Sequence, residues 1–438
     1  MSRVVVVGGG YGGMAAAARL AKQGHEVTLL EASGRLGGAL DRVERDAFTW
    51  QAGPSTMLLP AVARDLFRKS GRPLDKELEL EHHPVVREHR FADGSSLVLP
   101  SSSREAQLHA VDALSPGLGE AWLAHVAAYG ETWELLRREY LERPWDPALA
   151  DRATTARLLP RETLHRRLRR ALPDRRLRVA AAYPALAEGH DPRQVPAWVG
   201  LTAYLEQRFG VWSVPTAAGG TAALADALVR RLRTRRVEVE LDTPVLDVVV
   251  RAGRAVAVTT AAGDVAADVV VCAVDPRRLP ALAPHVARTV PTLPAPAAHL
   301  GLEADGLPDL VAETVLHGKD ATLSVVPGGR APDGARAWTV RGRGRIHDDV
   351  VEALAREGLD LRKRVVRRVD VNPRDQVTRW GGSPWGVQWQ GRGTVLARLG
   401  PRTPIAGLYA AGAHATPGAG LPFVGLSAAL VAQAVGPA

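Results

Sequence analysis

Residues 2–38 read SRVVVVGGGYGGMAAAARLAKQGHEVTLLEASGRLGG, and this stretch decides the fold. The β-branched run from Val4 to Val7 is long enough for a buried parallel strand and too short for a helix. The Ala-rich run from Met14 to Ala21 favours a helix that ends at Gly24. A second strand is predicted from Glu26 to Leu30. The stretch therefore predicts a βαβ unit with glycines in its first turn.

The glycines in that turn follow the G-x-G-x-x-G spacing of dinucleotide-binding folds. Gly8 allows a tight turn, Gly10 lets the backbone approach a pyrophosphate, and Gly13 lets the helix pack closely on the strand. The helix N-terminus presents free N–H groups and a partial positive charge to the phosphates. Glu31 follows the second strand, where a carboxylate accepts hydrogen bonds from ribose hydroxyls and disfavours the 2′-phosphate of NADP.

The residues after the second strand narrow the range of possible cofactors. Glu31-Ala32-Ser33-Gly34-Arg35-Leu36-Gly37-Gly38 resembles the E-x-x-x-R-x-G-G run of the FAD-dependent amine oxidase and phytoene desaturase superfamily. In that superfamily the Arg lies by the adenosine ribose and the Gly pair passes close to the pyrophosphate. The resemblance implies FAD as cofactor. It also implies a Rossmann-like α/β FAD-binding domain of the amine-oxidase type, with a second, mixed α+β substrate domain.

Two further segments carry the same resemblance. Residues 50–56 are similar to the family's F-D-x-G-P segment beside the flavin ring, with Gln51 in place of the usual acid. Residues 408–426, LYAAGAHATPGAGLPFVGL, are similar to its terminal G-x-x-T-H-P-G-x-G-x-P motif, although Thr416 stands where the family has His. The resemblance implies FAD contacts for Gly8, Gly10, Tyr11, Gly12, Gly13, Glu31, Ala32, Arg35, Gly37, Gly38, Gly53, Pro54, Ser55, Thr56, Val245, Gly412, Gly420, Leu421 and Val424.

The substrate side of the site is less defined. Residues 201–229 are similar to the phytoene desaturase pattern in which F-G-V-W-x-x-P and a Gly-Gly turn enter a helix. Phe209 and Trp212, together with Phe423, are therefore candidate substrate-binding residues, although Trp212 is equally compatible with a core position. His414 is the candidate catalytic residue because the motif places it near the flavin.

A polar cluster lies in the predicted substrate region, at Glu188, His190 and Asp191. We interpret it as a polar loop in preference to a catalytic group. For metal ligation the sequence offers one cysteine and the adjacent pair His82 and His83, whose side chains point apart, so no metal site is predicted.

The resemblance divides the chain into discontinuous domains. The FAD-binding domain is predicted from residues 1–60, 211–275 and 400–438, and the substrate-binding domain from residues 61–210 and 276–399. Within the latter we expect a hairpin at Asp93-Gly94 and long helices at 104–114 and 119–141. The basic region 161–178 is predicted to be an amphipathic helix, interrupted by Pro173, whose arginine face is either solvated or in contact with a membrane.

Composition excludes several classes of protein. The net charge is +9, but the chain has no nucleic-acid recognition motif and only 5% aromatic residues, so we expect no nucleic-acid partner. The single cysteine, Cys272, lies in an apolar run and is predicted to be a small core residue in a reducing, cytoplasmic compartment. Prolines and glycines break the uncharged C-terminal run, so no transmembrane helix is expected. Peripheral contact with the inner face of the membrane and the oligomeric state stay open.

The chemistry expected is that of the cofactor, because the chain has no G-x-S-x-G nucleophile motif. The leading hypothesis is hydride transfer between flavin N5 and a hydrophobic isoprenoid or polyene substrate, as in a desaturase or saturase. Alternatives are amine oxidation, which the lack of a suitable lysine other than Lys319 disfavours, and a redox-neutral carotenoid-type isomerisation. A prenyl-binding protein on the same fold is the non-enzymatic alternative.

Overall fold

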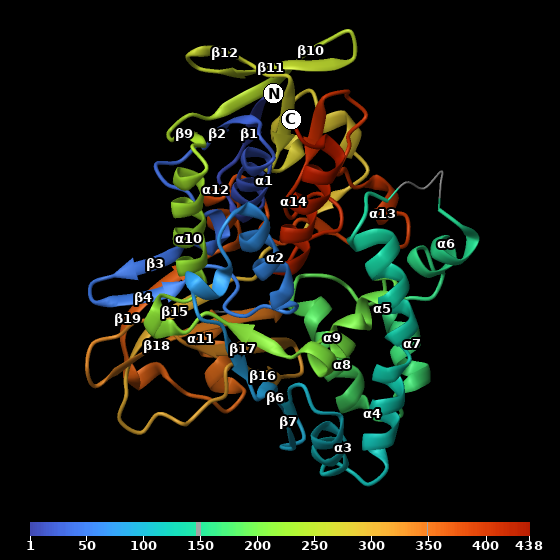
Figure 1. The fold of residues 1–438 in the computed structure, drawn as a ribbon. Coiled ribbons are helices and arrows are strands. Elements are labelled where there is room, and N and C mark those ends of the chain that lie inside the picture. Colours follow the sequence, from blue (N-terminus) through green and yellow to red (C-terminus); the bar gives the residue numbers. More distant parts are fainter. Residues whose placement is uncertain (146–149, 348) are drawn as a thin grey trace.

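The N-terminal strand belongs to a five-stranded parallel sheet (Figure 1). The computed structural model describes residues 1–145, 150–347 and 349–438. In order across the sheet, the strands are β21 (Leu408–Ala410), β13 (Val269–Cys272), β1 (Arg3–Val7), β2 (Glu26–Leu30) and β9 (Glu238–Glu240). The sheet thus joins both ends of the chain to its middle. The predicted βαβ opening is confirmed, with helix α1 (Tyr11–Lys22) between β1 and β2.

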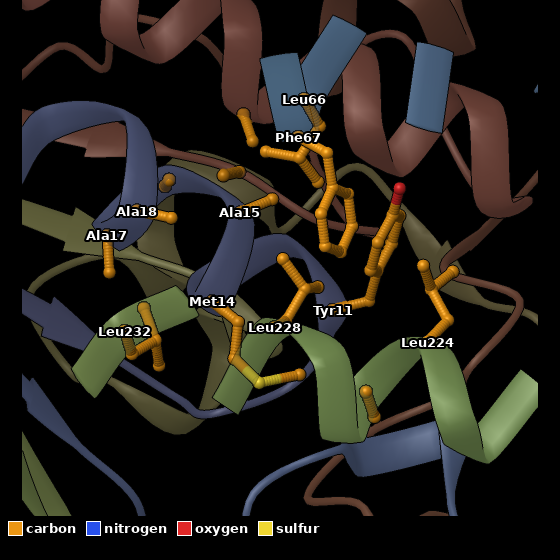
Figure 2. Packing of buried hydrophobic residues seen from close by; sticks show 14 of the residues in the cluster. Tyr11, Met14, Ala15, Ala17, Ala18, Leu66, Phe67, Leu224, Leu228 and Leu232 are labelled. Atoms are coloured by element: carbon orange, nitrogen blue, oxygen red, sulfur yellow. The ribbon is translucent and has the colours of Figure 1, made fainter. Parts of the chain in front are cut away.

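Helix α1 is enclosed on several sides. It packs against α2 (Pro60–Ser70), α10 (Thr221–Thr234) and α14 (Leu421–Val435). Figure 2 shows Leu66 and Phe67 of α2 on one side of α1, and Leu228 and Leu232 of α10 on the other. Every residue of α1 from Tyr11 to Leu20 is buried, which explains its alanine-rich composition, because larger side chains would hold the neighbouring helices away.

The remaining sheets are antiparallel apart from one parallel pair, β6 with β16. A seven-stranded sheet has the order β19 (Val365–Val371), β15 (Ala297–Glu303), β18 (Ala335–Gly344), β17 (Ala321–Pro327), β16 (Thr314–His317), β6 (Val85–Phe91) and β7 (Ser96–Pro100). A three-stranded sheet contains β10 (Val245–Arg251), β11 (Arg254–Thr260) and β12 (Gly263–Ala266). The two-stranded pairs are β3 (Arg42–Arg45) with β4 (Phe48–Gln51), β5 (Glu81–His83) with β8 (Val211–Ser213), and β14 (Val290–Pro291) with β20 (Val387–Gln388).

The other helices lie mainly between β7 and β8 in the sequence. They are α3 (Arg104–Asp112), α4 (Leu118–Ala127), α5 (Gly130–Leu136), α6 (Arg152–Leu158), α7 (Leu164–Ala171), α8 (Arg175–Ala187), α9 (Leu201–Phe209), α11 (Val350–Arg356), α12 (Pro373–Arg379) and α13 (Thr394–Ala397). The hairpin predicted at Asp93-Gly94 is confirmed as β6 and β7. The discontinuous domain boundaries stay a prediction.

The single helix predicted at 119–141 is wrong. The segment forms α4, α5 and a π-helical turn at Arg137–Leu141. The break falls beside Gly130, a weak helix former, and next to the buried Tyr129. The Tyr129 hydroxyl donates to the carbonyl of Ala197 at 3.2 Å, and the guanidinium of Arg167 lies over its ring. These tertiary contacts interrupt a helix that the local sequence favours.

The basic region 161–178 forms α7 and the start of α8, separated at Pro173. Leu164, Leu168 and Leu172 are buried, as their spacing predicts. Part of the arginine face is paired within the chain, since Arg170 contacts Glu162 at 2.8 Å. Elsewhere, burial raises the pKa of Cys272 to about 12, which agrees with a small core residue. In the described part of the chain, no helix has the length and apolar character needed to cross a membrane.

A buried ionic cluster connects the helices to the seven-stranded sheet. Arg87 of β6 contacts Glu206 of α9 at 2.8 Å and Glu313, just before β16, at 3.0 Å. Burial acts to lower the pKa of Arg87, but the two carboxylates more than offset this and raise it. Burial raises the pKa of Glu206, and Arg87 opposes that rise. The guanidinium therefore compensates two carboxylates from different elements of the chain.

We expect Arg87→Met to destabilise the protein by about 3–5 kcal/mol, because the buried Glu206 loses its cation and the partly exposed Glu313 keeps only the hydrogen bond from Tyr183. The loss should shrink as the pH falls, since unpaired carboxylates have raised pKa values in the folded state and are neutral in acid. Thermal unfolding followed by circular dichroism at neutral and acid pH measures both effects. Arg90→Met on the same strand is the control, because the Arg90 side chain, which pairs with Glu88, is 35% exposed against 11% for Arg87. Equal losses in the two variants would contradict this.

Candidate active site

A cavity of about 800 Å³ lies at the carboxyl ends of the parallel strands. Most of the residues predicted to contact FAD line it, namely Gly8, Gly10, Tyr11, Gly12, Glu31, Ala32, Arg35, Gly38, Gly53, Pro54, Val245, Gly412, Gly420, Leu421 and Val424. We call it the first cavity. Residues predicted from segments far apart in the sequence are thus brought together around one space.

Four predicted FAD contacts lie outside the first cavity's lining. Ser55 and Thr56 line a second cavity beside it. Gly37 donates its N–H to the carbonyl of Gly9, and Gly13 faces the strand that precedes it. A Cβ atom on Gly13 would lie 1.9 Å from the carbonyl oxygen of Gly8. Gly13 therefore allows the close helix–strand packing that the spacing predicts, and its role toward a cofactor is indirect.

The walls of the first cavity suit a dinucleotide. The N-termini of α1 and α14 both reach it, at Gly10 and Gly420, and neither has a side-chain cap. Free N–H groups at a helix N-terminus bind phosphate. A Cβ atom on Gly10 would meet no protein atom within 4 Å, so the backbone there is open for close approach by a ligand. These features fit the pyrophosphate of FAD.

Gly10 and Gly13 should respond differently to the same substitution. Gly10→Ala should leave the melting temperature of the FAD-free protein unchanged and weaken FAD binding about tenfold or more, because its methyl group enters only the cavity. Gly13→Ala should instead lower the melting temperature of the FAD-free protein, because overpacking costs about 1–3 kcal/mol. Thermal unfolding and FAD titration separate the two effects. If the substitutions lower both quantities alike, the assignment of the two roles is wrong.

The Glu31 carboxylate is bound by its own loop. One oxygen accepts the N–H of Gly9 at 2.6 Å, and the other accepts the N–H and hydroxyl of Ser33 at 2.9 and 2.7 Å. The side chain lines the first cavity from the end of β2. Arg35 also lines it and pairs with Asp41. The acid therefore orients the glycine turn as well as facing the cavity.

We expect Glu31→Ala to lower the FAD content of the purified protein, because it removes both a ribose acceptor and the hydrogen bond that orients Gly9. Glu31→Gln is the matched comparison, since it keeps the size of the side chain and one carbonyl acceptor, and its loss of FAD should be smaller. The flavin absorbance per protein chain measures both. Unchanged flavin content in Glu31→Ala would show that this residue has no part in retaining the cofactor.

His414 lines the first cavity and not the second. Its Nε2 donates to the carbonyl of Ser383 at 3.0 Å, and its Nδ1 lies 3.7 Å from the Asp275 carboxylate. Burial lowers the pKa of His414, which Asp275 partly opposes, so the ring is neutral near pH 7. With its N–H given to a backbone carbonyl, His414 holds two loops together. The catalytic role predicted for His414 stays a prediction. In this arrangement the ring has no N–H left to offer to a substrate.

The second cavity, of about 220 Å³, adjoins the first. The two share eight lining residues: Gly53, Pro54, Ala187, Ala295, Arg341, Trp385, Gly420 and Leu421. We call this shared wall the junction. Arg341 is the ionisable residue of the junction, and its guanidinium donates to the carbonyl of Gly53 at 3.0 Å. A ligand in the second cavity meets a ligand in the first at this place.

The candidate substrate-binding residues lie in different surroundings. Phe423 lines the second cavity. Phe209 and Trp212 line neither cavity: Phe209 packs edge-on against Trp133, and the Trp212 ring lies against His82 and under the guanidinium of Arg64. For these two residues the structure favours the packing interpretation over a substrate channel.

The second cavity carries charged residues that the sequence did not single out. They are Arg87, Glu206, Glu313, Arg341 and Arg343. They come from distant elements, so no local motif marks them. The alternation of Arg341 and Arg343 about Gly342 is the one signal available, because alternate residues of a strand share a face.

The predicted polar cluster at residues 188–191 is also divided. Glu188 lines the second cavity, and burial raises its pKa to about 7. His190 is buried beside it, and burial lowers its pKa to about 3. Asp191 is exposed and lines neither cavity. Among the residues described, no group of three or more His, Cys, Asp or Glu could hold a metal ion.

The comparisons with known proteins agree with this geometry. The family model of flavin-containing amine oxidoreductases matches residues 11–436. Hydroxyneurosporene desaturase of Cereibacter sphaeroides is 32% identical over 99% of this chain and 97% of its own. A 4,4′-diapophytoene desaturase of Staphylococcus aureus is 25% identical, over 57% of this chain and half of its own length.

Solved structures show the same fold. Cyclohexylamine oxidase from Brevibacterium oxydans superposes with a TM-score of 0.67 at 17% identity, covering 99% of both chains. An oxidoreductase from Methanosarcina mazei also gives a TM-score of 0.67 at 17% identity, covering 98% of this chain and all of its own. The predicted fold class, an FAD-binding α/β part with a mixed substrate part, is confirmed by these matches.

Proposed function

The chain belongs to the flavin-containing amine oxidoreductase family, and FAD is its cofactor. We propose its function from this starting point. It is an FAD-dependent oxidoreductase. The reaction that we infer is hydride transfer at a carbon–carbon bond of an isoprenoid or polyene, giving a desaturated product or, in reverse, a saturated one. When bound, FAD supplies N5 as the hydride acceptor. The observation that carries the proposal is the junction, the wall that the first and second cavities share and where a cofactor and a second ligand would meet.

The substrate class is proposed from two sources. Both curated relatives described above are named as desaturases of carotenoids. The second cavity also has apolar wall residues, among them Val86, Val326 and Phe423, that suit part of an isoprenoid chain. Each CH₂ buried there would contribute about 0.8 kcal/mol to binding, so a chain of several carbons binds without a polar handle.

Amine oxidation has less support. In the amine oxidases that the sequence resembles, a lysine lies at the flavin. Neither cavity here is lined by lysine within the described residues. Lys319 lies exposed between β16 and β17. We therefore propose carbon–carbon chemistry ahead of amine chemistry.

Peripheral membrane contact on the cytoplasmic side is part of the proposal, because apolar carotenoids partition into lipid. The support is the basic region 161–178, in which Arg166, Arg169 and Arg175 are exposed. Cationic side chains near an anionic surface each contribute about 1 kcal/mol to attraction.

Purified protein should be yellow, with the absorbance of oxidised flavin. Mixing it without oxygen with hydroxyneurosporene or 4,4′-diapophytoene, the carotenoids named in its relatives, should bleach the flavin because hydride enters the ring. Cyclohexylamine serves as the control for amine oxidation and should leave the colour unchanged. Bleaching by the amine alone would overturn the substrate class. A protein that neither retains nor binds added FAD would instead favour the prenyl-binding alternative.

A further inference from the structure

The desaturation proposed above needs a proton acceptor as well as a hydride acceptor. Removing hydride from one carbon leaves a positive charge, and a double bond forms only when the neighbouring carbon loses a proton. The ionisable residues that line the second cavity are Arg87, Tyr183, Glu188, Glu206, Glu313, Arg341 and Arg343. The proton acceptor is sought among them because they can touch a molecule in that cavity.

Most of these groups are occupied or unsuitable. Glu206 and Glu313 both pair with Arg87, at 2.8 and 3.0 Å, and the hydroxyl of Tyr183 donates to Glu313 at 2.6 Å. Arginines stay protonated and accept no proton. Among the described residues, Glu188 is the carboxylate of this cavity that has no arginine within ion-pair distance.

Glu188 is also close to the junction. It follows directly on Ala187, the last residue of α8, and Ala187 lines both cavities. The Glu188 side chain is 36% exposed and lies in the wall of the second cavity. A carboxylate in this place can touch a ligand that extends from the second cavity to the junction.

His190 lies beside this carboxylate. Its Nδ1 accepts the N–H of Trp389 at 3.4 Å, which assigns the ring proton to Nε2. That Nε2 lies 3.6 Å from Oε2 of Glu188. Because burial keeps the imidazole neutral near pH 7, its proximity does not neutralise the charge of the carboxylate.

We propose that Glu188 is the catalytic base that takes the substrate proton, an inference that rests on the proposed function. The C–H bond pair of one carbon leaves as hydride to FAD. The C–H bond of the adjacent carbon breaks, its proton goes to the Glu188 carboxylate, and its electron pair forms the new C=C bond. In the saturating direction Glu188 returns the proton to carbon, as microscopic reversibility requires.

The electrostatics around Glu188 suit this task. Burial raises its pKa to about 7, and the positive charges of Arg398, after α13, and Arg343, on β18, limit the rise. His190 is the third titratable neighbour and is neutral. A general base is most effective when its pKa lies near the working pH. The carboxylate fraction grows as the pH rises through about 7, so desaturation should speed up and saturation slow down over that range.

The test is anaerobic bleaching of the FAD-loaded enzyme by hydroxyneurosporene in detergent micelles. Glu188→Gln should lower the bleaching rate about 100- to 10,000-fold above the pKa, while flavin content and melting temperature stay at the wild-type level. The wild-type rate should rise through about pH 7, and this inflection should vanish in the variant. Glu188→Asp should recover part of the rate. Asp191→Asn, a nearby exposed carboxylate outside both cavities, is the matched control and should keep the wild-type profile.

A second readout is independent of turnover. Infrared difference spectra of the resting enzyme between acid and alkaline pH should contain a carboxylic acid band that titrates near pH 7 and is missing in Glu188→Gln. A Glu188→Gln enzyme that bleaches at the wild-type rate with the wild-type inflection would overturn the role of Glu188. If wild-type flavin is bleached by neither carotenoid, the proposed function itself fails.

Discussion

The close contact between α1 and β1 is the constraint on which the rest of the site depends. Gly13 lies so close to the carbonyl of Gly8 that any side chain would separate helix and strand. Because the helix is seated there, its N-terminus opens into the first cavity at Gly10. The neighbouring helices then pack on the small side chains of α1, and α14 brings a second helix N-terminus to the same cavity. Cofactor geometry thus follows from backbone packing.

The second cavity differs from the first, because its walls carry charged side chains although the ligand proposed for it is apolar. Arg87, Glu206 and Glu313 solve this by compensating one another, with Tyr183 adding a hydrogen bond. Arg343 donates instead to the carbonyl of Ala187, the last residue of α8, and to that of Leu293, between β14 and β15. The pairing of Arg87 with Glu206 and Glu313 lowers the cost of placing a hydrocarbon beside these charges, and Glu188 is the carboxylate of this cavity that such arginine pairing leaves out.

The fold and the cofactor side could be predicted from sequence because their determinants are local. The run of β-branched residues, the glycine spacing and Glu31 lie within one short segment, and the structure places β1, α1 and β2 there. The helix predicted at 119–141 failed because Tyr129 makes contacts with Ala197 and Arg167, which no local pattern records.

The substrate side could not be predicted for a related reason. Its charged lining residues come from β6, α9 and β18 and from the positions just after α8 and just before β16, so only the folded chain brings them together. Sequence motifs instead pointed to Phe209 and Trp212, whose rings pack against Trp133 and His82. An aromatic residue in a family motif does not by itself distinguish a core position from a channel.

The junction carries a positive charge next to both cavities. Arg341 lies on the wall that both cavities share, and it has a backbone carbonyl as its hydrogen-bond partner there. In the proposed reaction a hydride would carry negative charge toward the first cavity, and the guanidinium of Arg341 on the shared wall would stabilise that charge without reorganising. Arg341 cannot exchange a proton near pH 7, so proton transfer must use another group. In the proposed reaction the hydride would therefore pass the Arg341 cation at the junction, while the proton would go to the Glu188 carboxylate in the second cavity.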